Sequence, residues 1–228
     1  MITQAIQDYL KIIYKLGAEQ KPVNTNAISD RMCIAQGSVT GMLKKLAELN
    51  LITYTPYHGV RLTDTGKKIA LEIIRHHRLL ELYLAEALGY SWDRVHDEAE
   101  KLEHHISEEF EDRVAEFLGD PDFDPHGAPI PSKDGTLPDR LLSPLNLAQT
   151  GSRVRVEQVS DSDPEILRYL GNLGIFPAVE LDVLEKIPFG STLLVQIGGT
   201  RHHLGEKLTQ SIMISKISKS TPNRGELV

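Results

Sequence analysis

Imidazole and carboxylate side chains gather in one short stretch of this 228-residue chain, between Val95 and His105. At about 100° per residue, four of them fall on one stripe of a helix, namely His96, Glu100, Glu103 and His104. An adjacent apolar stripe can pack the core on its own, and it consists of Val95, Ala99, Leu102, Ile106 and Phe110. The polar stripe is therefore free to bind a divalent cation.

Two other places in the chain offer donors of the same kind. His77 and Glu81 stand four residues apart, a spacing that brings both side chains onto one face of a helix. Asp8, on the polar face of the first predicted helix, could complete the site. Oxygen-rich ligands with one or two imidazoles suit manganese(II) or iron(II), whereas structural zinc favours thiolates. The alternative is a solvated surface on which these charges form only ion pairs four residues apart.

The charge of the chain is distributed unevenly. The formal net charge is -7, yet the segment from Met1 to Leu62 has seven lysines and arginines against four aspartates and glutamates. An acidic protein with a basic N-terminal module would bind DNA better once divalent cations neutralise some of its carboxylates. Composition alone therefore hints at metal-gated DNA binding.

Other features of the composition narrow the class of protein. Cys33 is the only cysteine, which excludes an internal disulfide, and we expect it to be a small buried residue. No stretch of about 18 apolar residues occurs, and the first residues lack the pattern of a signal peptide. We therefore expect a soluble cytoplasmic protein that does not use a membrane.

The first 63 residues have the pattern of a winged helix-turn-helix. Helical periodicity covers residues 3–17, and two short helices are predicted at 25–32, with Asn24 or Thr25 as N-cap, and at 38–49. Residues 51–54 and 60–62 read as a hairpin around a glycine turn, which would form the wing.

The remaining chain divides into three parts by pattern. We predict a helical metal-binding and dimerisation domain at 64–120, with helices at 64–88 and 92–118, and a proline-rich linker at 121–150. Strands at 152–159, 179–185, 193–197 and 212–217, with a helix at 164–173, indicate a small all-β domain at 151–220. The predicted fold class is mainly α with a small all-β domain.

The predicted second helix of the helix-turn-helix has the residues that reading DNA requires. Small residues let the backbone approach the duplex, polar groups meet base edges and cations meet phosphates. The candidate groove contacts are Gln36, Gly37, Ser38 and Thr40, and the candidate phosphate contacts are Lys44, Lys45 and Arg61. The alternative is a helical hairpin whose polar residues are only solvated.

The order of these elements closely resembles the diphtheria toxin repressor and manganese transport regulator family. The motifs His76-His77-Arg78-Leu79-Leu80-Glu81 and Val95-His96-Asp97-Glu98-Ala99-Glu100, followed by Glu103-His104, carry the resemblance, which extends through Pro125 to Pro131. The C-terminal part resembles, more weakly, the SH3-like β-barrel that the family shares with ferrous-transport accessory proteins. The resemblance implies a metal-dependent repressor that binds a double-stranded DNA operator as a homodimer and controls metal-homeostasis genes.

The resemblance also implies a set of metal ligands. The primary site maps to Asp8, His77, Glu100, Glu103 and His104, and the second site involves Glu81, with His96. Further ligands of the second ion map to Asp124 and His126, with Asp163 or Glu165 as the nearest carboxylates of the third domain. The iron-responsive branch has methionine and cysteine where this chain has Asp8 and Glu100, so manganese(II) is favoured over iron(II). Lys11 departs from the manganese branch, which often has a carboxylate there.

Two other functions are compatible with parts of the pattern. One is a winged-helix regulator that does not respond to metal. The other is a divalent-metal hydrolase, but the chain has no HExxH motif, P-loop or serine-nucleophile elbow. We therefore expect a protein that is not an enzyme.

Overall fold

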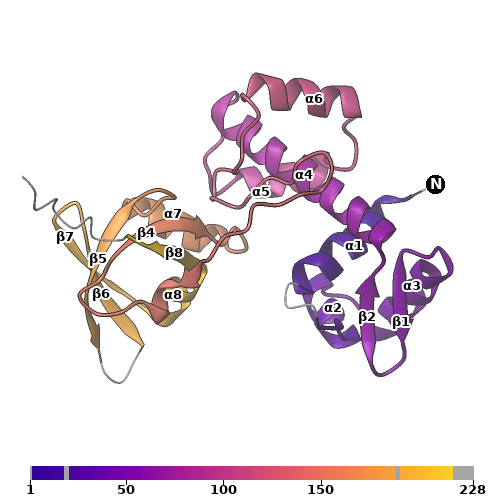
Figure 1. Ribbon diagram of the computed structural model, residues 1–228, viewed down its shortest axis with the longest axis horizontal. Helices are drawn as coiled ribbons and strands as arrows, with labels where there is room; N and C mark the ends of the chain where they lie inside the picture. The colour runs from indigo at the N-terminus through magenta and orange to yellow at the C-terminus, as the bar shows by residue number, and fades with distance from the viewer. Residues whose placement is uncertain (1, 18–20, 188–190, 218–228) are drawn as a thin grey trace, which may run out of the picture. The chain divides into compact units, whose positions relative to one another are not determined.

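The computed structural model describes residues 2–17, 21–187 and 191–217 (Figure 1). The chain forms two compact units. The first comprises residues 1–90, 95–124 and 129–138, and the second comprises residues 91–94, 125–128 and 139–228. Residues 218–220 of the predicted last domain lie outside the described part.

The first unit begins with a three-helix module and a hairpin. Its elements are α1 (Gln4–Leu16), α2 (Thr25–Met32), α3 (Gln36–Glu48), β1 (Ile52–Thr55) and β2 (Gly59–Leu62). Asn24 caps α2, since its side chain accepts a 2.7 Å hydrogen bond from the Ala27 amide. The hairpin pairs Ile52 with Leu62 and Thr55 with Gly59. This arrangement confirms the predicted winged helix-turn-helix, with α3 starting two residues earlier than expected.

One buried cluster holds this module together. Leu10, Ile28, Leu43 and Leu46 are fully buried, and Val60 of the hairpin joins them. Cys33 does not, because it is exposed at the left-handed C-cap of α2. Our expectation of a buried cysteine was therefore wrong.

A long helix and two short ones form the rest of the helical unit. They are α4 (Asp64–Glu86), α5 (Val95–Leu102) and α6 (Glu108–Phe117). The prediction of one helix from 92 to 118 was wrong, because the chain leaves the helical path after Leu102 and Ser107 begins a new helix. The Ser107 hydroxyl accepts a 3.2 Å hydrogen bond from the Phe110 amide. The apolar periodicity continues across the break, so the sequence pattern could not reveal that the helix ends after Leu102.

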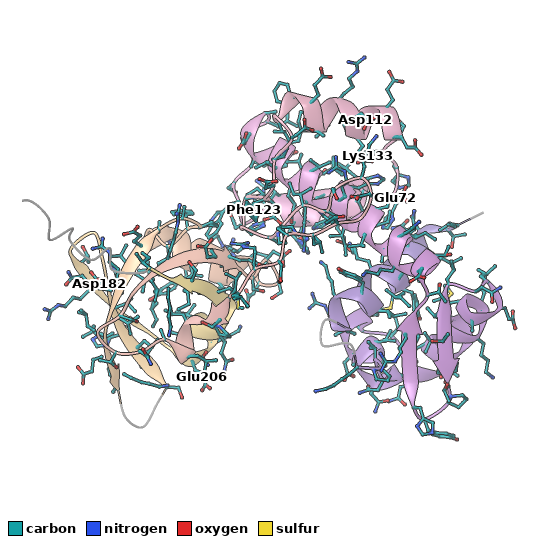
Figure 2. The ribbon with its side chains drawn as sticks, in the orientation of Figure 1. Glu72, Asp112, Phe123, Lys133, Asp182 and Glu206 are labelled. Atoms are coloured by element: carbon teal, nitrogen blue, oxygen red, sulfur yellow. The ribbon has the colours of Figure 1, made fainter. Side chains whose placement is uncertain are left out.

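Part of the proline-rich segment is fixed against the helical unit. Arg75 donates a 2.8 Å hydrogen bond to the Pro131 carbonyl, and Arg78 donates one to the Pro129 carbonyl. Lys133 forms an ion pair with Asp112 at the surface of α6 (Figure 2). These contacts keep residues 129–138 in the first unit.

The second unit is built on an antiparallel sheet with strand order β3-β8-β4-β5-β6-β7. The strands are β3 (Ser143–Pro144), β4 (Arg153–Val159), β5 (Glu180–Ile187), β6 (Thr192–Ile197), β7 (Thr200–Leu204) and β8 (Ile212–Lys216). The 3-10 helix η1 (Leu145–Leu147), α7 (Pro164–Asn172) and α8 (Glu206–Ser211) accompany them. Figure 2 labels Asp182 on β5 and Glu206 at the start of α8. The outer strands β3 and β7 do not pair within the described residues, so no closed barrel forms there.

The four predicted strands and the predicted helix of this unit are present, whereas β3, β7 and α8 were not anticipated. Alternating residues of the strands, such as Val154 and Val156, point into one apolar core with Leu167 and Leu170 of α7. Among the described residues, no helix has the length and apolar character needed to cross a membrane.

We predict opposite effects for alanine at two helical glycines. A Cβ at Gly66 would lie 2.0 Å from the Leu51 carbonyl oxygen, whereas a Cβ at Gly41 would meet no atom within 4 Å. Gly66→Ala should therefore lower the free energy of unfolding by about 1–3 kcal/mol through overpacking. Gly41→Ala should raise it by about 0.5–1 kcal/mol, because alanine favours the helix. Urea denaturation measures both, and equal shifts would contradict the close packing of α4 on Leu51.

Candidate metal centre

Side chains from α1 and from the turn after α5 meet in the first unit. Asp8 Oδ1 lies 2.8 Å from His104 Nε2, and Glu103 Oε1 lies 3.2 Å from the same nitrogen. One ligand atom from each residue lies within 4.8 Å of the other two. This group contains three of the five residues expected at the primary site, and the other two, His77 and Glu100, form a group with the same Glu103.

Gln7, which the sequence did not single out, orients the His104 ring. The His104 Nδ1 donates a 2.9 Å hydrogen bond to Gln7 Oε1. The other nitrogen, Nε2, then has the lone pair that faces Asp8 and Glu103. Within the described residues this buried Nε2 makes no hydrogen bond. A hydrogen bond on one imidazole nitrogen that leaves the other for an ion is typical of metal-binding histidines.

His77 stands between two groups of donors. Its ring is buried, and Nδ1 lies 2.6 Å from Glu103 Oε2 and 3.4 Å from Glu100 Oε2. On the opposite edge, Nε2 lies 3.0 Å from Glu81 Oε1 and 3.1 Å from His96 Nδ1. A neutral imidazole has one lone-pair nitrogen, so His77 can bind an ion in only one group while it donates a hydrogen bond to the other.

The second group consists of Glu81, His96 and the outer nitrogen of His77. Glu81 is fully buried, and its Oε1 lies 3.1 Å from His96 Nδ1. The structure therefore places two of the residues expected at the second site, Glu81 and His96, next to each other. His77, expected in the primary set, also lies within hydrogen-bonding distance of Glu81.

Lys11 also enters the cluster, one turn after Asp8 on α1. Its ammonium lies 2.7 Å from Glu100 Oε2 and 2.6 Å from Glu103 Oε1. Burial alone would lower the pKa of Lys11, but the carboxylates of Glu103 and Glu100 outweigh it and raise the pKa above its usual value. The ammonium is therefore a fixed positive charge among the expected ligands.

The electrostatics of the cluster differ from one group to the next. Burial raises the pKa of Asp8, whereas Lys11 outweighs burial at Glu100 and lowers the pKa of that carboxyl. Burial alone would lower the pKa of His77, but Glu81 and the hydrogen bond to Glu103 raise it. Because an ion needs the neutral imidazole and the ionised carboxylates, its binding must displace protons from this cluster.

The donor set fits a hard or borderline divalent cation. Aspartate and glutamate oxygens with one or two imidazoles provide the ligands that manganese(II) and iron(II) accept, and Cys33 lies elsewhere, in the helix-turn-helix. Several ionised carboxylates in a buried cluster also repel one another unless cations compensate them.

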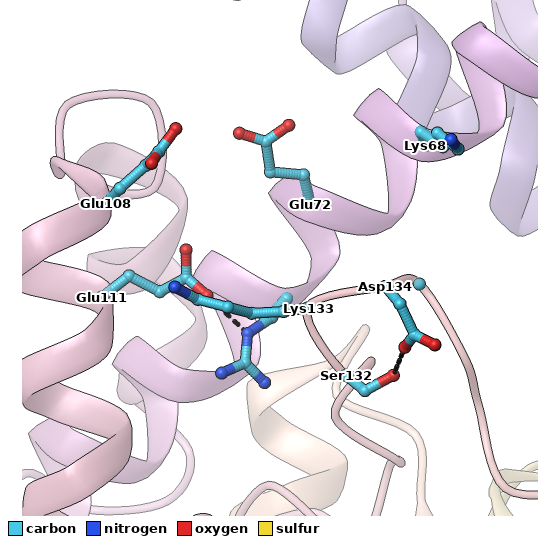
Figure 3. A pocket seen from close by; sticks show the side chains of 9 residues that line it. Lys68, Glu72, Glu108, Glu111, Ser132, Lys133 and Asp134 are labelled. Carbon is cyan, nitrogen blue, oxygen red and sulfur yellow. Dashed lines mark hydrogen bonds and ion pairs between the residues drawn. The ribbon is translucent and has the colours of Figure 1, made fainter.

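A second buried network holds the backbone that carries Glu103. His76 Nδ1 donates a 3.1 Å hydrogen bond to the Glu103 carbonyl, and His76 Nε2 lies 3.0 Å from Glu111 Oε2. Arg75 Nε donates a 2.5 Å hydrogen bond to the other Glu111 oxygen. Figure 3 shows Glu111 and its ion pair beside a polar pocket of about 450 Å³. The network fastens α6 to the end of α5.

The remaining expected ligands differ in their surroundings. Asp124 joins the second group, because one of its carboxylate oxygens lies within 4.8 Å of a Glu81 oxygen. Asp124 is buried in the first unit, 3.7 Å from Arg78 Nε, and His126 is buried in the second, where its Nε2 donates a 2.7 Å hydrogen bond to the Trp92 carbonyl. Asp163 caps α7 and pairs with Lys207 at 2.8 Å, and Glu165 is exposed. Among the described residues neither Asp163 nor Glu165 belongs to a cluster of potential metal ligands.

The expected DNA-contacting residues lie on α3 and, for Arg61, on β2 of the hairpin. Gln36, Gly37, Ser38, Lys44, Lys45 and Arg61 are exposed, and Thr40 is half-buried. Gln36, Thr40 and Lys44 line a groove of about 510 Å³ between α3 and the hairpin. The start of α2 and the wing also line it, with residues that sequence reasoning missed: Asn24, Thr25, Asn26, Tyr54 and Tyr57.

Three family models match consecutive parts of the chain. "Iron dependent repressor, N-terminal DNA binding domain" matches residues 1–60, and "Iron dependent repressor, metal binding and dimerisation domain" matches residues 63–132. "FeoA domain" matches residues 143–216.

Known proteins agree with these matches. The iron-dependent repressor IdeR of Mycobacterium leprae is 27% identical over 92% of this chain and 96% of its own length. The regulator MntR of Oceanobacillus iheyensis is 34% identical over 52% of this chain and 80% of its own length. A manganese-dependent transcriptional repressor solved with manganese has a TM-score of 0.86 and 38% identity, covering 92% of this chain and 99% of that one. The manganese-activated repressor ScaR in its apo form has a TM-score of 0.79 and 32% identity, covering 92% and 100%.

We predict that Glu111→Gln destabilises the fold in a pH-dependent way. Burial would raise the pKa of Glu111, but His76 and Arg75 lower it from 4.5 to about 2. A lowered pKa means that Glu111 stabilises the fold above about pH 4.5 and that this contribution disappears as the pH falls toward 2. The variant should lose roughly 2 kcal/mol near neutral pH, since one pKa unit corresponds to about 1.4 kcal/mol and partners share the effect.

Urea denaturation between pH 7 and pH 3 measures this loss, with the exposed neighbour Glu109→Gln as control. The difference between the two variants should shrink below about pH 4.5. A difference that stays constant with pH would contradict the ionic role of Glu111.

Proposed function

We propose that this chain, which belongs to the diphtheria toxin repressor family of metal-dependent transcriptional repressors, represses metal-homeostasis genes in response to manganese(II). The observation that carries the proposal is the cluster of Asp8, Glu103 and His104, in which the helix preceding the helix-turn-helix meets the metal-binding domain. An ion bound there would supply positive charge that holds the three side chains together. Iron(II) is the second candidate ion.

The donor chemistry favours manganese(II). Asp8 and Glu100 are carboxylates at the two positions where the iron-responsive branch has sulfur, and harder ligands suit manganese. Two structural relatives described as manganese-dependent repressors, at 37–38% identity, and one described as a manganese regulator, at 30%, agree with this choice. IdeR and the diphtheria toxin repressor are more distant, at 27% identity.

The glycines of α3 support its role as the DNA-reading helix. Gly37 and Gly41 are exposed, and a Cβ at either position would meet no atom within 4 Å. Glycine inside a helix costs about 0.5–1 kcal/mol relative to alanine, and internal packing does not require it here. Glycine would instead allow the helix backbone to lie close to an external surface, as the backbone of a recognition helix does in the major groove of DNA.

The side chains around these glycines divide into two proposed roles. Gln36 and Ser38 would contact base edges. Thr40 could only accept a hydrogen bond from a base, because its hydroxyl hydrogen is donated to the Gln36 carbonyl at 2.9 Å. Lys44, Lys45 and Arg61 would contact phosphates. The groove between α3 and the wing adds Asn26 and Tyr57 as further candidates.

The regulatory step follows from where α1 is anchored. Ile6, Leu10 and Ile13 of α1 are buried in the core of the winged module, while Asp8 faces the metal-binding domain. Fixing Asp8 therefore fixes the module. In a homodimer this sets the spacing of the two recognition helices on a double-stranded operator, which converts ion binding into DNA affinity.

The proposed division of labour keeps the predicted boundaries. Residues 1–63 read DNA, 64–120 bind metal and dimerise, 121–150 link, and 151–220 form the SH3-like domain. A hydrolase is not supported, because the family consists of DNA-binding repressors and not enzymes.

We predict that manganese(II) raises DNA affinity and that Glu103→Gln abolishes the increase. Titrations of the promoter region upstream of the protein's own gene, at fixed salt, should show about 5–150-fold tighter binding with manganese(II) than with chelator. Iron(II) and zinc(II) are tested in parallel. The control is Glu98→Gln on α5, the helix that precedes Glu103, because the Glu98 carboxylate pairs only with surface Lys101 at 3.0 Å among the ion pairs described. Equal binding in chelator and manganese(II) would exclude metal gating.

We also predict that Lys44→Ala and Gln36→Ala weaken DNA binding in different ways. Loss of a phosphate contact at Lys44 should lower affinity for every sequence and reduce the slope of log affinity against log salt by about 1. Loss of a base contact at Gln36 should reduce the preference for the operator and leave the salt slope unchanged. Lys101→Ala, on the exposed face of α5, is the control. An unchanged slope in Lys44→Ala would remove Lys44 from the phosphate contacts.

A further inference from the structure

Lys11 is buried where the proposed function places a metal ion. Its side chain is 4% exposed, and among the described residues no other lysine or arginine is buried. Burying an ammonium is unfavourable unless carboxylates pair with it. Lys11 meets this condition, because it pairs with Glu100 and Glu103, two carboxylates of the metal-binding and dimerisation domain.

The oxygens that Lys11 contacts are potential ligand atoms. His77, Glu100 and Glu103 form one of the groups whose donor atoms lie close enough to hold an ion. In that group the Glu100 oxygen nearest His77 is Oε2, and the same oxygen lies 2.7 Å from the Lys11 ammonium. The ammonium thus interacts with the Glu100 oxygen of this group as a second ion would. On Glu103 it contacts Oε1, the oxygen that faces His104, so it lies between the two groups that share Glu103.

The charges of the cluster agree with this position. With neutral imidazoles, Asp8, Glu100 and Glu103 carry three negative charges, and Lys11 reduces the net charge to -2. One divalent ion at Asp8, Glu103 and His104 then balances the cluster. A second divalent ion would leave an excess of two positive charges in a buried place, which is unfavourable.

We propose that the Lys11 ammonium is a permanent cation of the primary centre, which occupies the place of a second ion and limits the centre to one divalent ion. The proposal rests on the proposed metal-binding function. It leaves Nε2 of His77 to the group with Glu81 and His96, because Nδ1 then donates its hydrogen bond to Glu103.

The test counts manganese(II) ions per protomer of the full chain by equilibrium dialysis, and it detects neighbouring ions by electron paramagnetic resonance. Lys11→Glu replaces the cation with a ligand, so this variant should bind one more ion than the wild type and show a spin-coupled pair. Lys11→Gln, which removes the charge without adding a carboxylate, should also gain an ion, with weaker affinity. Adding Glu103→Gln should remove one ion from the wild type and two from Lys11→Glu.

The matched control is Lys101→Glu, the same charge change at an exposed position of α5. It should leave the number of bound ions unchanged. A wild type that already shows a coupled pair, or unchanged ion counts in both Lys11 variants, would overturn the proposal. Absence of manganese(II) binding, or DNA binding that ignores metal, would instead contradict the proposed function. The ion count and the DNA titration therefore separate the two failures.

Discussion

Buried carboxylates that require compensating cations are the constraint on which the helical unit depends. Glu81 and Glu103 are fully buried and Glu111 nearly so, each on or beside a different helix. An uncompensated charge in such a place costs several kcal/mol. Each carboxylate therefore determines which element may pack beside it, and the elements that bring lysine, arginine or histidine are the ones found there.

The compensation is of two kinds. Arg75 and His76 are part of the chain and hold Glu111 whether or not an ion is bound. Asp8 and Glu103 converge on His104 Nε2, which makes no hydrogen bond within the described residues, so a bound cation would compensate the two carboxylates there. The permanent charges thus fix α4, α5 and α6, and Lys11 ties α1 to Glu100 and Glu103, while the part of the α1 junction at Asp8 and His104 depends on an exchangeable cation. A repressor that responds to metal needs this division, because only the element that moves the reading helix should depend on the ion.

The sequence predicted the elements whose signals are local. Asn24 caps α2, as one of the two expected N-caps, and the apolar spacing of α1 matches its buried face. Thr63, a residue type common at helix starts, caps α4. The break after Leu102 could not be predicted from periodicity, because Ile106 and Phe110 continue the apolar stripe. Ser107 was the available signal, since serine followed by three glutamates within four positions is typical of a helix start.

Tertiary contacts determined what the sequence left open. Asp163 was weighed as a ligand, but its carboxylate caps α7, a role that its place before Pro164 already indicated. Lys11 was noted as a departure from the family, yet its burial between two carboxylates depends on how α1 meets α5. No pattern within either helix contains that information.

The break between α5 and α6 explains how one cluster can serve both DNA reading and dimerisation. In a continuous helix the Glu103 carbonyl would bond to an amide four residues on, but here His76 of α4 donates to it. His76 also contacts Glu111 of α6, which lies in the domain matched as metal-binding and dimerisation. The backbone of Glu103, a proposed ligand, is therefore positioned by His76 of α4, which Glu111 of α6 holds in turn. A change in α6 on dimerisation would reach Glu103 through these two hydrogen bonds, and a change at Glu103 would return by the same path, because coupling between two sites is reciprocal.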